Sequence, residues 1–521
     1  MRRNRRIWGI ALAALYAALL FAITLAERDA PGSAIRSVWD ALWFSLVTIT
    51  TVGYGDLAPV TPAGRMLCLV FLLLSAGFLA FLVSLAARWL SGRLLPALRI
   101  RLDRSPRWYL FSEWNAESAA LAKNLLADRP DSLALFCGAE RLPPEAEDRC
   151  LAVPEEAEAL LSRKEAARHD VTLFLWGKEE ENLSAALRLA GRVRIVCRGQ
   201  QEAMMLLPKE VLFFDPEDSA ARIYWRDHPL KASESRILLV GSGSLARALL
   251  HRSLLTNVLL PFRQTEIHVF GDWSDYRRRH YRLEDAVSLN ETKPGQDALF
   301  FHEGPWNGDP ELLSRADRII LCVDQPAKNL ALAGRLLSWY TPAGTVDARL
   351  DESLPGIRSF GGPERLLTGD NVLRERLDAL ARSMHDHYRQ EQGEASVPAW
   401  EELDRGARES NAAAADHLTV KARLLTGLEE EPPGPALFRQ ARDRYAALED
   451  AARETCRRNE HERWCRFYRL RNWTPGPARD PQRRTHPCLV PFDALSPEDQ
   501  AKDDYAWKQL ETAAEMEEIR K

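Results

Sequence analysis

Two long apolar runs dominate the first hundred residues, at positions 7–26 and 66–90. Each is long enough to cross a lipid bilayer as a helix. Arginines gather before the first run and after the second, so the positive-inside rule predicts a multi-pass protein of the cell inner (plasma) membrane with both termini in the cytoplasm. The first run exceeds the usual core of a secretory signal, the alternative reading. A shorter amphipathic run, 39–50, suits a pore helix.

The segment between these runs contains a glycine-rich motif with the chemistry of an ion-selectivity filter. A dehydrated potassium ion needs a cage of oxygens, which backbone carbonyls of such loops supply. We expect Gly53 and Gly55 to adopt left-handed backbone angles, which glycine tolerates without steric cost. K⁺ ligands are expected at Thr51, Val52, Gly53 and Tyr54. The predicted filter residues are Thr51, Val52, Gly53, Tyr54, Gly55 and Asp56.

The motif resembles the signature of potassium channels, and the resemblance extends upstream through the pore helix. It implies a homotetramer in the lipid bilayer with K⁺ as the permeant ion. Related channels commonly have a hinge glycine midway along the inner helix. Here the candidates are Gly77 and Ser75, and close helix packing is the alternative use of these small residues.

From about residue 107 the pattern changes to short apolar runs that alternate with helical segments, which indicates parallel α/β units. The first unit covers residues 107–230, with strands expected near 108–111, 133–137, 171–176, 194–197 and 211–214. The turn after its first strand, residues 112–118, contains no glycine. We therefore expect this unit to bind no dinucleotide in the standard way.

A second unit, residues 231–375, has the features that the first lacks. A buried-strand run at 236–240 precedes a G-x-G-x-x-A pattern and a helix, and this context makes the pattern meaningful. Asp272 follows the next strand, 266–270, and could accept hydrogen bonds from ribose hydroxyls. The sequence predicts NAD or another adenine nucleotide at Gly241, Ser242, Gly243, Ser244, Ala246 and Asp272. The alternative is a turn that only preserves the fold.

The two units resemble the RCK (regulator of potassium conductance) domains of ligand-gated potassium channels over residues 107–370. This resemblance implies that four chains contribute eight units to a cytoplasmic ring, which acts on the inner helices when a ligand binds.

The last part, residues 380–515, is predicted to be mainly helical and is rich in tryptophan. It resembles the ryanodine-receptor repeat (RyR) domain, although Asn472 and Pro475 depart from that family's pattern. By this resemblance we expect a second nucleotide site, for which flat rings and positive charges suit a base and phosphates. The candidates are Trp400, Arg463, Trp464, Trp473 and Arg479. Alternatively these tryptophans are core anchors and the arginines are solvated.

Composition adds little to this interpretation. The net charge is −4 and the eight cysteines form no C-x-x-C pair. No nucleophile–base constellation is present, so we expect no enzyme, and we expect no nucleic-acid partner. The fold class is a membrane α pore (residues 1–100) followed by α/β, with two tandem Rossmann-like units and a helical domain.

The predicted function is a tetrameric potassium-selective channel, gated by a nucleotide or related small ligand, and compatible with a stress or defence effector. Two alternatives fit the same features. One is a membrane-tethered NAD-dependent oxidoreductase, and the other is a channel whose RyR domain only docks a partner protein.

Overall fold

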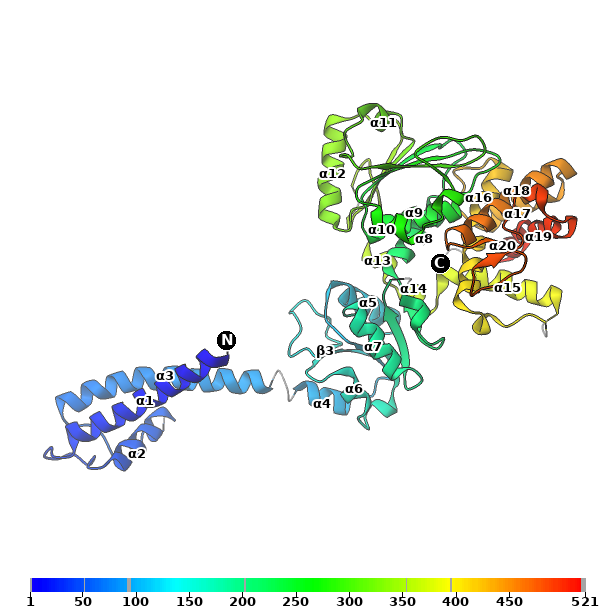
Figure 1. The fold of residues 1–521 in the computed structure, drawn as a ribbon. Coiled ribbons are helices and arrows are strands. Elements are labelled where there is room, and N and C mark those ends of the chain that lie inside the picture. Colours follow the sequence, from blue (N-terminus) through cyan, green and yellow to red (C-terminus); the bar gives the residue numbers. More distant parts are fainter. Residues whose placement is uncertain are drawn as a thin grey trace. The chain divides into compact units, whose positions relative to one another are not determined.

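The computed structural model describes residues 2–50, 52–90, 95–200, 203–352, 354–393 and 396–516. The chain forms two compact units. One comprises residues 1–104 and 152–154, and the other comprises residues 105–151 and 155–521. Figure 1 shows their elements along the chain.

The first unit, called the pore unit below, consists of helices. They are α1 (Arg2–Glu27), α2 (Val38–Ile49), α3 (Pro62–Trp89) and α4 (Leu95–Leu102). Ser37 and Asp40 form a capping box that starts α2. The buried carboxylate of Glu27 accepts hydrogen bonds from the backbone N–H groups of Val60 (3.0 Å) and Thr61 (2.9 Å). This contact joins the end of α1 to the residues just before α3. It therefore holds these two helix ends together independently of the filter segment.

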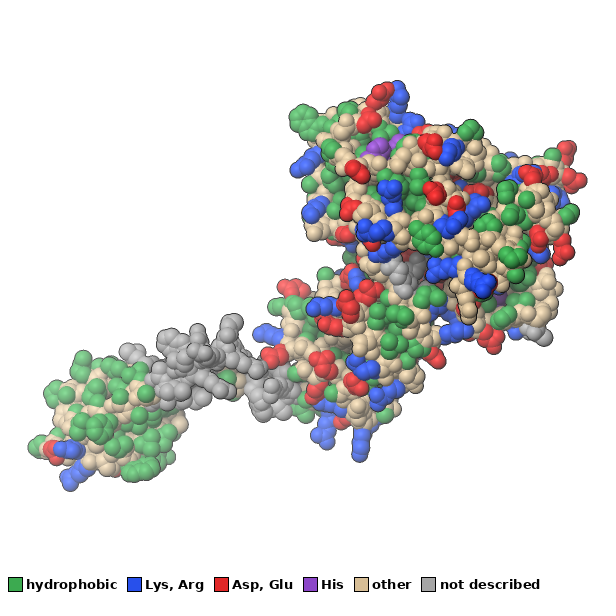
Figure 2. All heavy atoms as spheres, in the orientation of Figure 1, with side chains coloured by type: hydrophobic (Ala, Val, Ile, Leu, Met, Phe, Trp, Pro, Cys, Tyr) green, Lys and Arg blue, Asp and Glu red, His purple; other side chains and the backbone are tan. Residues whose placement is uncertain are grey.

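Large apolar side chains of the pore unit lie on its surface, as Figure 2 shows for its described residues. Trp39 is 78% exposed and Phe21 is 56% exposed in the single chain. Among the described residues, no helix is both long enough and apolar enough to cross a membrane. Ser75 and Gly77 belong to the α3 segment, but their side chains lie outside the described residues.

The first α/β unit is a six-stranded sheet in the order β3-β2-β1-β4-β5-β6. Pairing is parallel between β1 and both its neighbours, between β4 and β5, and between β5 and β6. The strands are β1 (Arg107–Phe111), β2 (Ser132–Cys137), β3 (Cys150–Val153), β4 (Asp170–Leu175), β5 (Arg194–Arg198) and β6 (Leu212–Phe214). The helices are α5 (Ala116–Asp128), α6 (Ala157–Leu161), α7 (Glu179–Leu189) and α8 (Pro216–Asp227).

The second α/β unit is a parallel seven-stranded sheet in the order β13-β12-β11-β7-β8-β10-β9. Its strands are β7 (Arg236–Val240), β8 (Glu266–Phe270), β9 (Ser288–Leu289), β10 (Ala298–His302), β11 (Arg318–Leu321), β12 (Thr345–Arg349) and β13 (Arg358–Phe360). Helices α9 (Ser244–Thr256) and α10 (Ser274–Arg279) lie on one face (Figure 1), and α11 (Pro310–Ser314) and α12 (Pro326–Trp339) lie on the other. Both sheets therefore have the doubly wound strand order.

The remaining part is helical, with two short paired strands. Its helices are α13 (Pro363–Leu366), α14 (Gly369–Leu373), α15 (Ala379–Gln392), α16 (Arg405–Thr426), α17 (Pro435–Ala446), α18 (Asp450–Arg469), α19 (Pro497–Lys508) and α20 (Leu510–Glu515). Strands β14 (Thr474–Pro475) and β15 (Thr485–His486) pair in parallel. A core around the fully buried Trp507 holds α15 to α20 together. The predicted fold class, a helical pore followed by two Rossmann-like sheets and a helical region, is confirmed.

Buried polar contacts attach α16 and α18 to the second sheet unit. The Arg466 guanidinium lies 2.8 Å from the Asp297 carboxylate, and both side chains are at most 2% exposed. Asn459 donates to the carbonyls of Val258 (2.9 Å) and Leu260 (2.6 Å). These polar groups are buried away from water. If the helices moved, the groups would lose their partners without gaining water, which would cost free energy.

The replacement Asp297→Ala tests this attachment. It leaves Arg466 buried with Glu462 as its remaining ion-pair partner, and removing one side of a buried pair costs about 3 kcal/mol or more of unfolding free energy. We expect a clear fall in the unfolding temperature of the full chain, followed by tryptophan fluorescence.

The control is Glu311→Ala, which removes the exposed pair between Glu311 and Arg315. Exposed pairs contribute at most about 1 kcal/mol, so the control should unfold close to the wild-type temperature. Equal unfolding temperatures for both variants would contradict the attachment.

Candidate functional site

The filter segment has the backbone that its glycines predict. Gly53 (φ 58°) and Gly55 (φ 76°) are both left-handed. The N–H groups of Val52 and Gly53 donate to the carbonyl of Val47 in the pore helix α2, at 3.0 and 3.2 Å. Thr51 lies outside the described residues. The side chains of Val52 and Tyr54 are more than half exposed in the single chain.

Trp43 of α2 holds the outer end of this segment. Its indole N–H donates to the Asp56 carboxylate at 3.0 Å, and its ring stacks parallel to Tyr54 with centroids 6.3 Å apart. The segment after Thr51 is thus fixed at both ends to one helix. Trp43 was missed in the sequence, because only the fold brings a residue of the pore helix beside the residue that ends the filter.

In the first sheet unit, side chains of the turn after β1 hydrogen-bond to the backbone just after β4. The Asn115 amide donates to the Trp176 carbonyl at 2.9 Å, and the Ser112 hydroxyl accepts from the Trp176 N–H at 2.8 Å. Asn115 also caps α5 by accepting from the Ser118 N–H. The Ser118 N–H at the start of α5, a donor of the kind that binds phosphate at a helix N-terminus, is thus already occupied by Asn115.

The glycine-rich turn of the second sheet unit connects β7 to α9. Gly241 has φ 139°, and a Cβ there would lie 2.8 Å from the Cys322 carbonyl oxygen at the end of β11. Gly271, with φ 119°, passes the Ser242 side chain equally closely. These glycines are required by the close approach of three strand ends, whether or not a ligand binds.

The N-terminus of α9 already has an anionic neighbour. A Cβ at Gly243 would lie 2.0 Å from a carboxylate oxygen of Asp324, and the Leu245 N–H donates to that carboxylate at 3.4 Å. A pyrophosphate at this turn must therefore share the helix end with a negative charge. Sequence reasoning missed Asp324, which lies about 80 positions along the chain from the glycines.

Asp272 follows β8 and is exposed, as a ribose acceptor must be. Its carboxylate accepts a hydrogen bond from the Ser274 N–H at 3.0 Å. Hydrogen bonds from Ser274 lower the pKa of Asp272, so the carboxylate is ionised at neutral pH.

Two of the predicted RyR-region residues are core residues. Trp400 is 2% exposed, and Arg382 and Arg408 lie over its ring. Arg463 is equally buried and forms an ion pair with Glu460 at 2.6 Å, which also binds Lys421 at 2.6 Å. The structure therefore places Trp400 and Arg463 in the core. The other three candidates, Trp464, Trp473 and Arg479, lie outside it.

Those three residues line a cavity of about 1290 Å³ between the helical region and both sheet units, of which the first contributes Gln200, Met205, Asp215, Glu217 and Asp218. One wall is a single face of α9, with Ser244, Arg247, Ala248 and His251, followed by Tyr276, Arg279 and His280. Another wall is a face of α18 and the loop after it. This wall comprises Trp464, Phe467, Tyr468, Arg471, Asn472, Trp473, Arg479, Pro481, Arg484 and His486.

Aromatic rings cluster on the α18 wall. Tyr468 lies between Trp464 (centroids 4.7 Å apart) and Trp473 (5.0 Å), and Trp464 meets His486 edge-on at 4.8 Å. The His486 Nδ1 accepts the Cys488 N–H at 3.1 Å. Burial lowers the pKa of His486 and the charge of Arg479 lowers it further, so this ring is neutral at pH 7 and carries its proton on Nε2.

Asn472 explains one departure from the RyR pattern. Its φ is 61°, the left-handed conformation that glycine adopts freely and that asparagine tolerates better than most residues. Its side chain donates to the Arg279 carbonyl at 2.8 Å, beside the contact between His280 and the Leu470 carbonyl. Asparagine therefore keeps the turn before Trp473 and adds a contact with α10.

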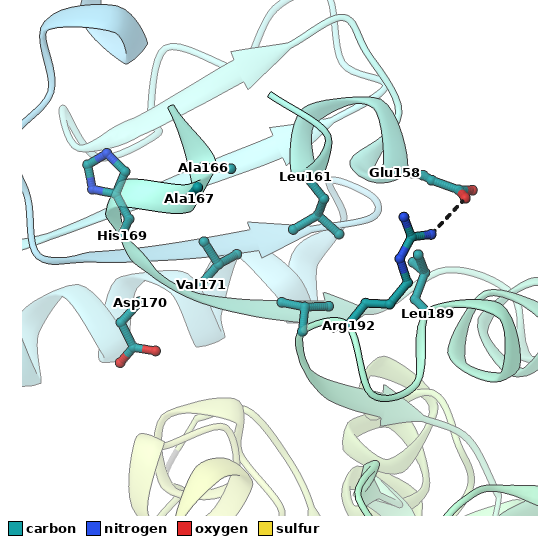
Figure 3. Close-up of a pocket in the computed structure, with 10 residues that line it drawn as sticks. Glu158, Leu161, Ala166, Ala167, His169, Asp170, Val171, Leu189 and Arg192 are labelled. Carbon is teal, nitrogen blue, oxygen red and sulfur yellow. Dashed lines mark ion pairs between the residues drawn. The ribbon is translucent and has the colours of Figure 1, made fainter. Parts of the chain in front are cut away.

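A second, smaller hollow lies in the first sheet unit (Figure 3). Its volume is about 370 Å³, and Leu161, Val171 and Leu189 supply much of its lining. The ion pair between Arg192 and Glu158, 3.7 Å, closes one side. This hollow lies where β4 and β5 begin, whereas ligands of doubly wound sheets bind where strands end, so it has the wrong position for a nucleotide.

Two known families match this chain, one near each end. Residues 9–92 match the model of an ion channel family, and residues 446–516 match that of the RyR domain. The predicted channel pore region and RyR domain are thereby confirmed. The matched pore family is one of channels, in line with the expectation that the protein is not an enzyme.

The similar curated proteins are potassium channels. A voltage-gated potassium channel of Aeropyrum pernix is 45% identical over 75 residues, which is 14% of this chain and 25% of that protein. The calcium-gated potassium channel TvoK of Thermoplasma volcanium is 32% identical over 80 residues, 15% of this chain and 21% of that protein. The chain thus matches a quarter or less of the length of these relatives.

Solved structures give weaker likenesses. The GsuK channel bound to NAD has a TM-score of 0.34 at 12% identity, covering 73% of this chain and 86% of that one. GsuK bound to ADP has a TM-score of 0.34 at 16% identity, covering 71% of this chain and 100% of that one.

Replacing Gly241 by alanine tests the requirement for glycine at the β7–α9 turn. The Cβ would meet backbone at 2.8 Å in a conformation that L-residues rarely adopt, and such strain costs about 1–3 kcal/mol. We expect a lower unfolding temperature in a thermal melt of the full chain.

The matched control is Gly334→Ala on the exposed face of α12, where a Cβ meets nothing within 4 Å. Alanine favours a helix over glycine, so the control should not be destabilised. If the two variants melted alike, the turn would not need its glycine.

Proposed function

We propose that this chain is the subunit of a tetrameric potassium-selective channel in the cell inner membrane, opened or closed by a nucleotide that binds the region after the pore. The observation that carries the proposal is the filter segment. It combines two left-handed glycines, backbone hydrogen bonds to the pore helix, and the Trp43–Asp56 hydrogen bond.

A filter of this kind needs four copies, because one loop can offer carbonyls from only one side of the ion. The exposed apolar side chains of the pore unit suit contacts with lipid and with neighbouring subunits. Both termini and all residues after the pore are proposed to be cytoplasmic. A stress or defence role is compatible with this assembly.

Nucleotide control is proposed from the second sheet unit. The β7–α9 turn has the glycines and the ionised Asp272 that a dinucleotide fold uses, and the resemblance to RCK domains suits a gating role. The ligand could shift the gate only by its different affinities for the open and closed states. An RyR region that merely docks a protein is the competing proposal. In that case, deleting residues after about 380 should leave nucleotide affinity and response unchanged.

Potassium flux into liposomes that contain the purified full chain tests the channel. We expect faster uptake of K⁺ than of Na⁺ when a suitable nucleotide is present. Equal rates for the two ions, or no flux with any nucleotide, would reject the proposal.

A pair of glycine variants isolates the filter. Gly53→Ala and Gly32→Ala both force alanine into left-handed backbone (φ 58° and 83°), but only Gly53 is in the filter. We expect Gly53→Ala to abolish selective flux and Gly32→Ala to keep it. Loss of flux in both variants would show that general destabilisation, and not the filter, is responsible.

Asp272→Ala tests the nucleotide site by calorimetry on the full chain. Deleting a charged ribose acceptor should weaken adenine-nucleotide binding several-fold or more. Asp351→Ala, which removes another exposed carboxylate of the same unit, should bind as the wild type does. Unchanged affinity in Asp272→Ala would remove the ribose-binding role of this residue.

A further inference from the structure

The large cavity between the helical region and both sheet units has the features of a ligand site in its own right. Its volume of about 1290 Å³ exceeds the range of about 300–1,000 Å³ that is common for small-molecule sites. A mononucleotide would leave much of it filled by water. The size therefore points to a ligand with two ring systems.

Both walls present aromatic rings. The α18 wall has Trp464, Tyr468, Trp473 and His486. The wall from the second sheet unit has His251, Tyr276 and His280, in which His280 lies 4.2 Å from Tyr276 and 5.3 Å from His251 by ring centroids. Flat rings on two separate walls suit two bases, because every base offers a π-face for stacking.

Unused hydrogen-bonding groups occur on the same walls. The hydroxyl of Tyr276, a residue that is 3% exposed, is buried without a hydrogen-bond partner among the described residues, and so is Nδ1 of His251. Buried polar groups are seldom left unpaired in folded proteins. A ligand in the cavity would reach these two atoms only if the side chains around them moved.

Positive charge is available at the RyR end of the cavity. Arg479 is exposed and has no ion pair or hydrogen bond within the described part of the chain. Three other arginines of the lining form ion pairs, Arg471 with Glu409 at 2.6 Å, Arg247 with Asp275 at 2.8 Å and Arg279 with Asp275 at 2.7 Å. Among the residues that the structure describes, Arg484 has no ion pair but donates to the Arg471 carbonyl at 3.2 Å. Arg479 can therefore bind a phosphate without giving up an ion pair or a hydrogen bond.

The loop that carries Arg479 is held in shape by its own hydrogen bonds. Asp480 and Thr485 exchange backbone hydrogen bonds at 3.0 and 3.1 Å, and the Asp480 carboxylate accepts the N–H groups of Gln482 and Arg483. A Cβ at Gly476 would lie 2.6 Å from the Thr485 side chain, so the loop closes tightly on itself. This arrangement positions Arg479 before any ligand arrives.

Acidic groups of the lining are mostly occupied and lie on other elements. Asp218 of α8 binds Arg252, and Asp404 caps α16 by accepting the Ala407 N–H. Glu217 lies 4.0 Å from Arg198, and burial raises its pKa. These acids leave the α18 wall as the place where an anion is favoured.

From these observations we propose that the cavity is a single composite site for a dinucleotide, linear or cyclic, shared between the second sheet unit and the RyR region. One base stacks in the Trp464–Tyr468–Trp473 cluster, the other lies against the rings from α9 and α10, and Arg479 binds a phosphate. The inference rests on the proposed function only in taking a nucleotide as the ligand. The cavity shares Ser244 with the predicted site at the β7–α9 turn, whereas Asp272 does not line it.

Such a site would also couple its two walls. Asn472 connects the loop of Trp473 to α10 through the Arg279 carbonyl, so a ligand that orders this loop stabilises the contact with the second sheet unit. Ligand binding thereby favours the arrangement in which this contact is made.

Calorimetry on the full chain in detergent tests the site with NAD⁺, cyclic di-AMP and cyclic di-GMP, and with AMP and ATP for comparison. We expect at least one dinucleotide to bind about tenfold more tightly than AMP and ATP, since a second base adds stacking. Arg479→Ala and Trp473→Ala should each weaken its binding by about tenfold.

The matched control is Arg483→Ala, in the same loop but outside the cavity lining, with a side chain 84% exposed. It should change the affinity less than twofold. Arg479 is on the surface, so its variant reports on binding even if Trp473→Ala fails to fold.

Three results would overturn the inference: no binding by any of the three dinucleotides, binding that is unchanged in Arg479→Ala, or mononucleotides that bind as tightly as dinucleotides. Loss of binding in Asp272→Ala with normal binding in Arg479→Ala would place the ligand at the β7–α9 turn, which supports the proposed function and rejects the composite site. Binding that depends on Arg479, in a protein that passes no potassium, would keep the site and reject the channel proposal.

Discussion

Helix α9 has almost no solvent face, and much of the second compact unit depends on this burial. It begins at the glycine-rich turn, packs its apolar residues on the second sheet, and contacts α8, α16 and α18 on its other sides. Its buried Arg252 is neutralised by Asp218 of α8. A displacement of α9 would therefore alter its contacts with α8, the last helix of the first sheet unit, and with the helical region.

Buried charges enforce this arrangement. Arg222 of α8 binds Asp378 and Asp416 at 2.7 and 2.8 Å, while Arg466 of α18 binds Asp297 beside the second sheet. Moving one partner away would leave a charge in a site without water, which costs far more than losing a surface pair. The tightly packed parts can thus move relative to one another only at a large cost in free energy. That property suits a module that transmits ligand binding.

The two candidate ligand sites differ in what their geometry offers. At the β7–α9 turn the backbone has the shape of a dinucleotide site, but Asp324 already supplies negative charge to the helix end. In the cavity, rings and a free guanidinium are present, three of them (Trp464, Trp473 and Arg479) among the candidates that the resemblance to the RyR domain suggested. The first site was recognisable because its glycines are adjacent in the chain. The second required residues from α9, α10, α18 and the loop after it to be brought together.

Local patterns in the sequence were sufficient for the filter, the pore helix, most strands of the first sheet, and β7 and β8 of the second. The filter needs glycines at fixed neighbouring positions, and buried strands need continuous apolar runs. The short strands β3, β9 and β13 were not predicted, because pairing with neighbours rather than residue type decides them. The five-residue strand β10 was also not predicted.

Roles that depend on distant partners were beyond the sequence. Trp400 and Arg463 were ligand candidates by residue type, yet burial and ion pairs make them core residues, whereas Trp464, Trp473 and Arg479 line the cavity. The same side chain can stack on a base or fill a core, and the sequence specified only its chemistry. The tertiary structure decided which role it takes, because burial and partners are set by segments far away in the chain.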